Sequence, residues 1–423
     1  MRDRSLRRLR YVSRLNVADS HAQAAVSRRQ WRSIGVILLL LASFGCRRPV
    51  VPQPSPIPQA ITLPGGPREV RVTLKESAES ATVEVKGAFE VRPQYSSVVF
   101  LKGSRLPPTK VTPTEAGMQF GATELKTASI EVVPADGTPF YVDGSGYRGR
   151  LIVTRLRDMK LLAVDELDLE DYVAQVAGAE LFRSWHLECF KAQCIVLRTF
   201  LLQRMIERHV RRYDIRAGAG EVLFRGIAGE NPTSVRAGRE TAGMVIIYDG
   251  RLVPGYYHTV CGGHTTGPEN GFGLPSIPPL TGVPCGFCQP ATYYSWTAEV
   301  DAGQLAAARG LKGLTSVKVL SRDASGRAMT IEIRDKSKSD TLTGAEFRRL
   351  CGINKVRSTL FEITLDKDKL VLKGRGWGHG VGMCQWGAQG MALKGYSAVE
   401  IVKHYFPGAD VVRLYDAEKR NPL

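Results

Sequence analysis

Two helical patterns separated by a short break constrain the fold of this chain more than any other stretch of it. The first pattern places four apolar residues on one helical face, namely Leu169, Tyr172, Val173 and Val176, and Gly178 is a residue type that commonly ends a helix. The second pattern repeats apolar residues at steps of three and four up to about residue 208: Leu187, Phe190, Cys194, Leu197, Leu201 and Met205. We therefore expect two core-facing helices joined by a turn that contains one carboxylate, Glu180.

Strand-like runs lie on both sides of these helices. Residues 68–160 contain short alternating runs, such as Val70–Leu74 and Ala81–Val85, with turn residues between them. Residues 161–412 mix strand and helix patterns, with an α+β insert expected at about 297–370, and residues 413–423 form a tail. The sequence predicts an α+β fold: a mixed, strand-rich body with a few helices around a long groove, preceded by a small β subdomain.

The N-terminus has the pattern of an export signal. An arginine-rich segment precedes the apolar run Ile34–Ala42, which is too short to span a membrane as a helix, and Cys46 follows Gly45 directly. We predict that residues 1–46 are an export or lipoprotein signal with lipid on Cys46; ordinary cleavage or retention as an anchor is the alternative. Residues 47–67 alternate proline with other residues, which favours an extended linker. The expected location is the cell envelope, on a membrane and facing the periplasm or cell wall.

The charge is unevenly distributed along the chain. The net charge is +17, and eleven arginines with only two aspartates lie in the first 48 residues. The remaining, mildly basic body suits a polyanionic partner, for which cell-wall polymer and nucleic acid both qualify. The sequence has no RNP motif, no zinc-finger spacing and no basic stripe with interleaved aromatics, so we do not expect nucleic acid to be the partner.

A group of cysteines and histidines has the spacing of a metal site. The sequence has His-x2-Cys-x2-His followed by Cys-x2-Cys, which gives five candidates for the four N or S ligands that zinc prefers: His258, Cys261, His264, Cys285 and Cys288. We expect four of these five to hold a structural zinc ion. Disulfides between Cys261 and one cysteine of the CxxC pair are the alternative in an oxidising compartment.

Several ordered blocks of the chain resemble one known family. The blocks are Tyr172–Glu180, Ser184–Gln193, Arg198–Thr199, Tyr256–Thr265, Gly374–Ala388 and His404–Gly408. Together they cover roughly residues 160–410 and are similar to the SpoIID/LytB family, the cell-wall proteins called stage II sporulation protein D and amidase enhancer. The resemblance therefore identifies residues 161–412 as a SpoIID/LytB-like catalytic domain.

The resemblance implies a lytic transglycosylase that cuts peptidoglycan glycan strands, preferring strands stripped of stem peptides. The family's essential glutamate maps onto Glu180, and a tyrosine of its groove maps onto Tyr256. Cys261 and Cys384 stand where many members have serine. The same blocks supply the remaining substrate-binding candidates: Gly262, Gly263, His379, Gln385, Lys191 and Arg198. The name amidase enhancer implies a cell-wall amidase as a possible partner.

The chemistry fits a single carboxylate. Hydrolases use two carboxyl groups, whereas a lytic transglycosylase needs one acid, because the sugar's own C6 hydroxyl attacks and forms a 1,6-anhydro product. An apolar site would favour the protonated form of Glu180. Glu170 and Asp171 are expected to be solvated acids of a first helical turn. Two other functions remain open: a non-catalytic glycan-binding activator of an amidase, and a zinc hydrolase that uses the Cys/His group.

Overall fold

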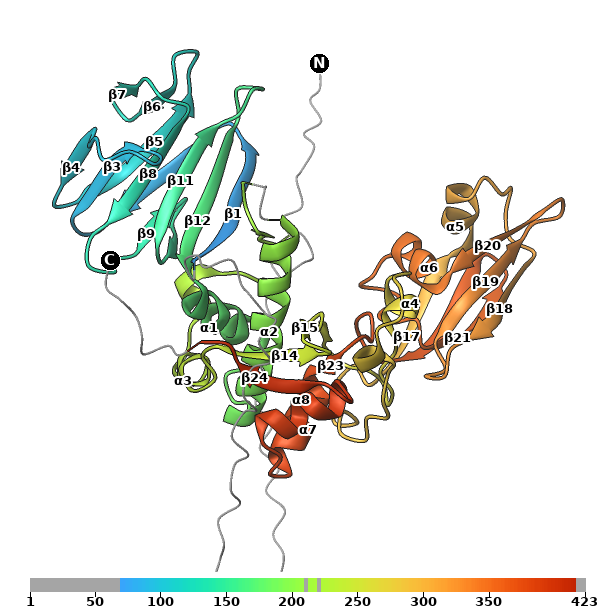
Figure 1. Cartoon of the computed structure of the whole chain (residues 1–423). Coiled ribbons are helices and arrows are strands. Elements are labelled where there is room, and N and C mark those ends of the chain that lie inside the picture. Colours follow the sequence, from blue (N-terminus) through green and yellow to red (C-terminus); the bar gives the residue numbers. More distant parts are fainter. Residues whose placement is uncertain (1–68, 209–211, 219–221, 416–423) are drawn as a thin grey trace, which may run out of the picture. The chain divides into compact units, whose positions relative to one another are not determined.

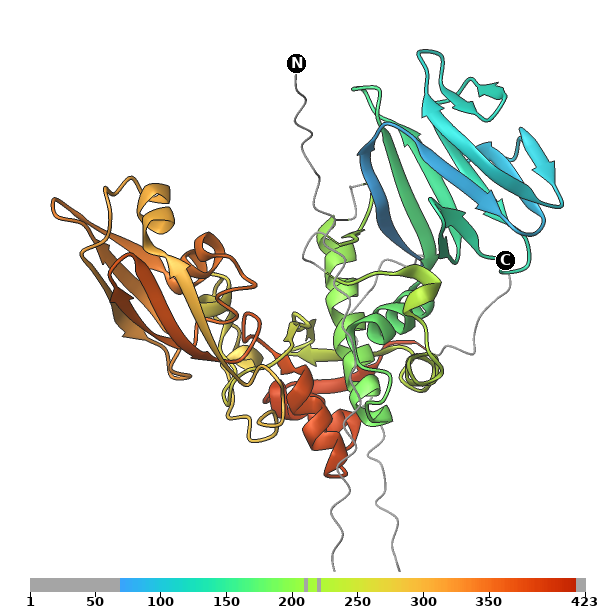
Figure 2. The ribbon, with the colours of Figure 1, turned by 180° about the vertical axis from the view of Figure 1, so that it is seen from behind.

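The computed structural model describes residues 69–208, 212–218 and 222–415 (Figures 1 and 2). The export signal with Cys46, the linker 47–67 and the tail beyond residue 415 lie outside these residues, so their predictions stay as made. None of the helices in the described residues combines the length and the apolar character that a membrane crossing requires. The fold of the described part is α+β, as predicted from the sequence.

Two sheets and their own core form the N-terminal subdomain. The seven-stranded sheet has the order β13-β1-β12-β11-β8-β3-β4 and the six-stranded sheet the order β10-β9-β2-β5-β6-β7. The strands of the first sheet are β1 (Glu69–Ala78), β3 (Phe89–Pro93), β4 (Leu101–Gly103), β8 (Ser129–Pro134), β11 (Arg150–Arg155), β12 (Leu161–Asp168) and β13 (Ile215–Arg216). Those of the second are β2 (Ala81–Val85), β5 (Leu106–Pro113), β6 (Met118–Phe120), β7 (Thr123–Leu125), β9 (Phe140–Val142) and β10 (Ser145–Tyr147). Alternate residues of these strands, such as Val83 and Val85, are fully buried, which is the period-two pattern of a sheet face.

The helical body follows directly from this sheet. Strand β12 ends at Asp168, whose side chain accepts hydrogen bonds from the backbone N–H groups of Glu170 and Asp171 and so caps helix α1 (Leu169–Glu180). Besides α1 and β13, helix α2 (Leu187–Arg208) contacts α3 (Pro232–Glu240), α7 (Gln385–Leu393), α8 (Ala398–Tyr405) and strand β14 (Met244–Tyr248). Four residues of the predicted α2 stripe are almost completely buried: Phe190, Cys194, Leu197 and Leu201. A three-stranded sheet, β15-β14-β24, adds β15 (Arg251–Leu252) and β24 (Asp410–Arg413).

Helix α1 is longer than the sequence predicted. Gly178 does not end it, and Glu180 is its last residue, followed by Leu181 in an extended conformation. The glycine is explained by close packing, because a Cβ atom at residue 178 would lie 2.2 Å from the backbone oxygen of Gly229. That residue belongs to the short 3-10 helix η1 (Gly226–Gly229), which contacts α1.

The region of the expected insert contains two three-stranded sheets and two helices that share a core of their own. One sheet has the order β17-β22-β21, from Ser295–Asp301, Lys369–Arg375 and Phe361–Asp366; the other has the order β18-β19-β20, from Ser316–Arg322, Ala328–Arg334 and Ser339–Thr343. The helices are α5 (Ala302–Ala308) and α6 (Gly344–Cys351). Between α2 and the insert lie short elements that shape the site: β16 (Tyr257–His258), α4 (Pro268–Gly271) and η2 (Pro278–Leu280), with β23 (Met383–Cys384) after the insert.

Candidate functional site

Glu180 is held at the C-terminal end of α1 by two hydrogen bonds to one of its oxygens. The backbone N–H of Leu223 donates to Oε1 at 3.0 Å, and the Tyr257 hydroxyl donates to the same atom at 3.4 Å. Within the described residues, Oε2 makes no hydrogen bond to the protein, and the side chain is half-buried. One oxygen is therefore anchored and the other is available for proton transfer.

The segments Tyr256–Thr265 and Gly374–Ala388, which both contain glycines, lie side by side. Strand β16 pairs in parallel with β23, with His258 opposite Cys384, and Val260 and Trp377 exchange backbone hydrogen bonds of 3.0 and 2.7 Å. Gly382 has a φ of +69°, and a Cβ atom there would lie 2.1 Å from the backbone oxygen of Tyr256. Glycine at this position therefore allows the two backbones to pack against each other.

A pocket of about 340 Å³ joins Glu180 to these motifs. Its lining residues come from α1, α2, the β16 segment, the α4 segment and the glycine-rich segment: Glu180, Phe200, Arg204, Gly255, Tyr256, Tyr257, His258, Thr259, Phe272, Trp377, Gly378, His379 and Gln385. Glu180 is the one carboxylate among these lining residues. A larger pocket of about 570 Å³ lies on insert strands β17, β21 and β22 and contains none of the predicted site residues.

Two histidines form a neutral wall of the pocket. Burial lowers the pKa of His258 well below its ordinary value, and burial lowers the pKa of His379 to about 3; Arg327 adds to both shifts. The Nδ1 of His258 lies 3.1 Å from the carbonyl oxygen of Val381, so this nitrogen carries the hydrogen and Nε2 is the acceptor. Nε2 of His258 and Nε2 of Gln385 are both buried without a hydrogen-bond partner. Two residues of the pocket lining thus each have one polar atom without a partner, an acceptor on His258 and a donor on Gln385.

Two aromatic side chains that closely follow Glu180 in the sequence cluster with one from helix α7. Phe182 lies with its ring centroid 5.4 Å from Trp185 and 6.1 Å from Trp386, and the two tryptophans are 5.1 Å apart. Phe182 is 58% exposed, while both tryptophans are partly buried against the main core. This aromatic cluster, Phe182, Trp185 and Trp386, is a rigid apolar surface of the kind that binding sites use.

The structure brings some predicted substrate-binding residues to the pocket and not others. Tyr256, His379 and Gln385 line it with Glu180, whereas Gly262 and Gly263 line a separate pocket of about 370 Å³ together with His264 and Cys285. The Lys191 ammonium group pairs with Glu188 at 2.8 Å and with Glu240 at 2.6 Å, so it does not reach the substrate pocket.

Arg198 also lies away from the pocket, in the core, which corrects its prediction as a substrate-binding residue. Its side chain is completely buried and pairs with Glu170 at 2.5 Å. Glu170 is likewise buried, contrary to the expectation of a solvated acid. A substrate has no access to a guanidinium group in this position, so Arg198 serves packing and charge pairing.

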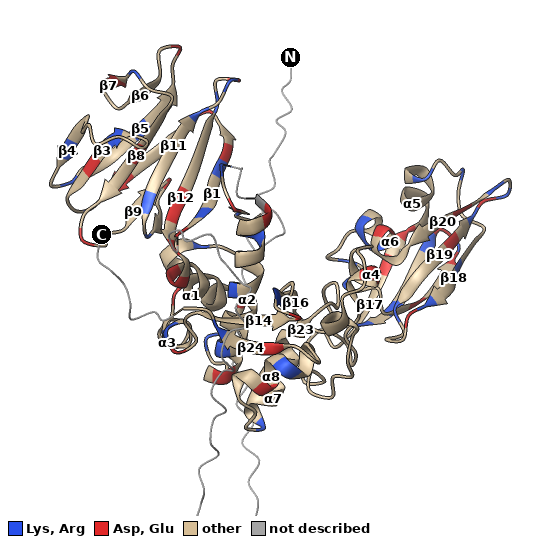
Figure 3. Cartoon of the chain, in the orientation of Figure 1, with Lys and Arg blue, Asp and Glu red and all other residues tan. Residues whose placement is uncertain are grey.

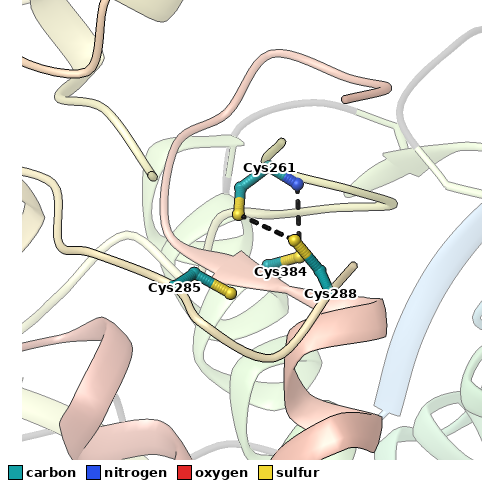
Figure 4. A group of neighbouring side chains, drawn as sticks. All are labelled: Cys261, Cys285, Cys288 and Cys384. Carbon is teal, nitrogen blue, oxygen red and sulfur yellow. Dashed lines mark hydrogen bonds between the residues drawn. The ribbon is translucent and has the colours of Figure 1, made fainter. Parts of the chain in front are cut away.

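Four cysteines from three segments converge beside the pocket (Figure 4). The Sγ atoms of Cys261, Cys285, Cys288 and Cys384 all lie within 4.8 Å of one another, and all four residues are buried and free of disulfide bonds. Three of them belong to the predicted metal set, whereas the fourth, Cys384, does not, and no histidine joins the group. His258 lines the pocket, and Nδ1 of His264 bonds the backbone oxygen of Thr265 at 2.6 Å.

Sequence reasoning missed Tyr257 and the place of Cys384. Tyr257 stands beside the predicted Tyr256 and lines the same pocket, where its hydroxyl bonds Glu180. Cys384 follows Cys261 by 123 residues, and pairing of β16 with β23 brings them together. A spacing motif does not reveal such a contact.

Comparisons with known proteins give two family matches. Residues 157–248 match the SpoIID model, described as stage II sporulation protein, and residues 289–382 match a domain of unknown function (DUF8618). An uncharacterised protein of Brachyspira hyodysenteriae is 28% identical over 81% of this chain and 92% of its own length. Stage II sporulation protein D of Bacillus subtilis is 25% identical over 59% of this chain and 76% of its own length. The amidase enhancer of Bacillus subtilis is 26% identical over 54% of this chain and 38% of its own length.

Proposed function

Because the chain belongs to the SpoIID/LytB family, we propose that it acts on the cell wall as a peptidoglycan lytic transglycosylase. The observation that carries this proposal is that Glu180 is the one carboxylate among the described residues that line the pocket. A glycoside hydrolase needs a second carboxyl group as base or nucleophile, whereas an intramolecular attack by the substrate does not. The family match at residues 157–248 includes Glu180 and both helices that flank it.

The proposed reaction uses the two oxygens of Glu180 differently. Oε1 is held by Leu223 and Tyr257, so Oε2 delivers a proton to the glycosidic oxygen as the bond from that oxygen to the anomeric carbon breaks. The C6 hydroxyl of the same sugar then bonds to the anomeric carbon, and its proton returns to Oε2. The acid is regenerated, no water is consumed, and the product ends in a 1,6-anhydro-muramic sugar.

The unsatisfied atoms of the pocket support an N-acetylated sugar as the ligand. An acetamido group offers a carbonyl acceptor and an N–H donor, which complement Nε2 of Gln385 and Nε2 of His258. The aromatic cluster would carry an apolar sugar face next to Glu180. A bare glycan, stripped of stem peptides, presents its rings directly to such a surface, which supports the peptide-stripped strand as the substrate.

The described strands and helices carry charges of both signs and no continuous basic stripe (Figure 3). Lys and Arg are interspersed with Asp and Glu along the described strands and helices (Figure 3). Export, lipidation at Cys46 and a cell-wall amidase as partner belong to this proposal as expectations. They would place the enzyme on a membrane that faces the wall.

Glu180→Gln tests the proposal, because glutamine keeps the shape of the side chain but cannot donate the acidic proton. Digestion of peptide-stripped glycan strands, followed by mass spectrometry, should show anhydro ends for the wild type. The rate for Glu180→Gln should fall by about 10²- to 10⁴-fold or more, which is the usual contribution of a general acid. Glu299→Gln is the matched control, since Glu299 is a surface residue paired with Lys369 on the insert.

Two results would contradict the proposal. Products that end in an ordinary reducing sugar would indicate hydrolysis, and full activity of Glu180→Gln would remove Glu180 from the reaction. The second candidate, a non-catalytic activator, is favoured by the similarity to the amidase enhancer. It predicts that Glu180→Gln still binds glycan and stimulates an amidase as well as the wild type does.

A further inference from the structure

The cysteine group has the geometry of a metal site. Tetrahedral zinc has Zn–S bonds of about 2.3 Å, which corresponds to sulfur–sulfur distances of about 3.8 Å. The four Sγ atoms lie within 4.8 Å of one another, with 3.4 Å between Cys261 and Cys288. We propose that Cys261, Cys285, Cys288 and Cys384 bind one zinc ion in a closed, structural site beside the pocket (Figure 4).

Several hydrogen-bond donors surround the sulfurs. Backbone N–H groups donate to sulfur at three positions: Cys261 to Cys384 at 3.2 Å, Gly387 to Cys384 at 3.3 Å and Gly263 to Cys261 at 3.4 Å. The Tyr405 hydroxyl lies 3.1 Å from the Cys285 sulfur. Thiolates are strong acceptors and thiols weak ones, so a cage of several donors is the outer shell expected for a thiolate metal site.

A buried arginine balances the charge of the site. A zinc ion with four thiolates carries two excess negative charges, which a buried location must offset. Arg327 is 1% exposed, and its guanidinium donates to the backbone oxygens of Cys261 at 2.6 Å and His264 at 2.8 Å. These contacts hold the positive charge of Arg327 next to the cysteine group. Arg327 belongs to the insert, whose strand β19 begins one residue later.

Disulfide bonding explains the positions of the four sulfurs less well than zinc binding does. The shortest recorded sulfur–sulfur distance, 3.4 Å, is well beyond a disulfide bond of about 2.05 Å. One disulfide would use two sulfurs and leave the other two as buried thiols among donors. A single tetrahedral ion uses all four sulfurs at once. Four protein ligands leave no open position for a reactive water, so the ion stabilises the structure and does not take part in the reaction.

The site would join two segments that line the pocket to a third that lies outside its lining. Cys384 directly precedes Gln385 at the start of α7, and Cys261 follows Thr259 by two residues. Cys285 and Cys288 lie in the Gly- and Pro-rich loop between α4 and β17. Zinc would thus fix the loop and the walls of the pocket, while Glu180 is held separately on α1. This inference is independent of the reaction proposed above.

Metal analysis of the full chain tests the site without an activity assay. Elemental mass spectrometry and native mass spectrometry of the wild type should give one zinc ion per chain. Cys288→Ser and Cys384→Ser should lose the ion, whereas Cys351→Ser should keep it, because Cys351 is buried in α6 outside the group. The wild-type measurement does not depend on whether the variants fold.

Three results would overturn the proposal. The first is a wild type without stoichiometric metal and with a mass two hydrogens lower than the reduced chain, which indicates a disulfide. The second is one iron in place of zinc, since the same tetrahedral sulfur geometry accepts both metals. The third is loss of zinc from Cys351→Ser to the same extent as from Cys288→Ser.

Discussion

Replacement of Arg198 by methionine should destabilise the protein without a direct effect on substrate binding. The Arg198 side chain is completely buried, and its Nε and Nη2 atoms bond Glu170 at 2.9 and 2.5 Å. Arg198→Met leaves Glu170 as a buried carboxylate that keeps two donors, the Tyr415 hydroxyl at 2.6 Å and the Gly243 N–H at 3.2 Å. Removal of one partner of a buried pair costs about 3–5 kcal/mol. The corresponding loss in melting temperature is roughly 10 °C for a domain of this size.

The pH dependence gives this prediction a distinct signature. Burial alone would raise the pKa of Glu170, but Arg198, Tyr415 and the Gly243 N–H together hold it below its ordinary value. In the wild type this carboxylate contributes stability above about pH 4.3, and the contribution is lost as the pH falls through the lowered pKa. Without Arg198 the burial effect dominates and the protonated form is preferred. The stability deficit of Arg198→Met should therefore be largest near pH 7 and smaller near pH 4.

Differential scanning calorimetry at both pH values measures the effect. The double variant Glu170→Leu with Arg198→Met is the matched control, since replacing a whole buried pair with apolar residues is often neutral or stabilising. It should recover most of the melting temperature. The reasoning fails if Arg198→Met melts like the wild type and binds glycan more weakly, because Arg198 would then be a groove residue as the family resemblance implied.

Three further changes test other parts of the structure. Tyr257→Phe removes a donor to Glu180 and should lower the turnover rate by about two- to tenfold at unchanged KM; a larger change in KM than in rate would contradict this role. Phe182→Ala should weaken glycan binding in a pull-down assay with little change in melting temperature, whereas Leu320→Ala, a similarly exposed residue on the insert, should not. Asp165 is buried with both oxygens unpartnered, and burial raises its pKa well above the ordinary value. The buried Asp165 carboxyl group therefore lowers the stability of the folded protein as the pH rises from about 4. Asp165→Asn should make the melting temperature fall less with rising pH, and an unchanged pH profile would refute this.

The elements that the sequence predicted well are those with local signals. The stripe of helix α2 was predictable because Phe190, Cys194 and Leu197 recur at helical spacing. Gly178 was misinterpreted because the reason for a glycine there, the oxygen of Gly229, lies far along the chain. Glu170 gave no local sign of burial, since its partners Arg198, Gly243 and Tyr415 are 28, 73 and 245 residues away.

The cysteine group shows why the site could be predicted only in part. The spacing of Cys285 and Cys288 predicts a metal site, and Cys261 lies in the same region of the sequence. The nearby histidines were therefore the candidates for a fourth ligand. Cys384 belongs to a different motif, where it stands in place of a serine. Its contact with Cys261 arises from the pairing of His258 with Cys384 across β16 and β23, and that pairing in turn directs His258 toward the pocket. One register thus places both Cys384 in the cysteine group and His258 at the pocket.

Different residues hold the Glu180 carboxylate and the walls of the pocket, and this difference has a functional consequence. Glu180 is oriented by α1, Leu223 and Tyr257, and none of these residues belongs to the cysteine group. Gln385 and Thr259, in contrast, lie within two residues of Cys384 and Cys261. If zinc fixes these walls, then its removal should weaken substrate binding more than it slows the proton transfer. Glu180→Gln should do the reverse and leave binding intact, so KM and kcat would separate the two parts of the site.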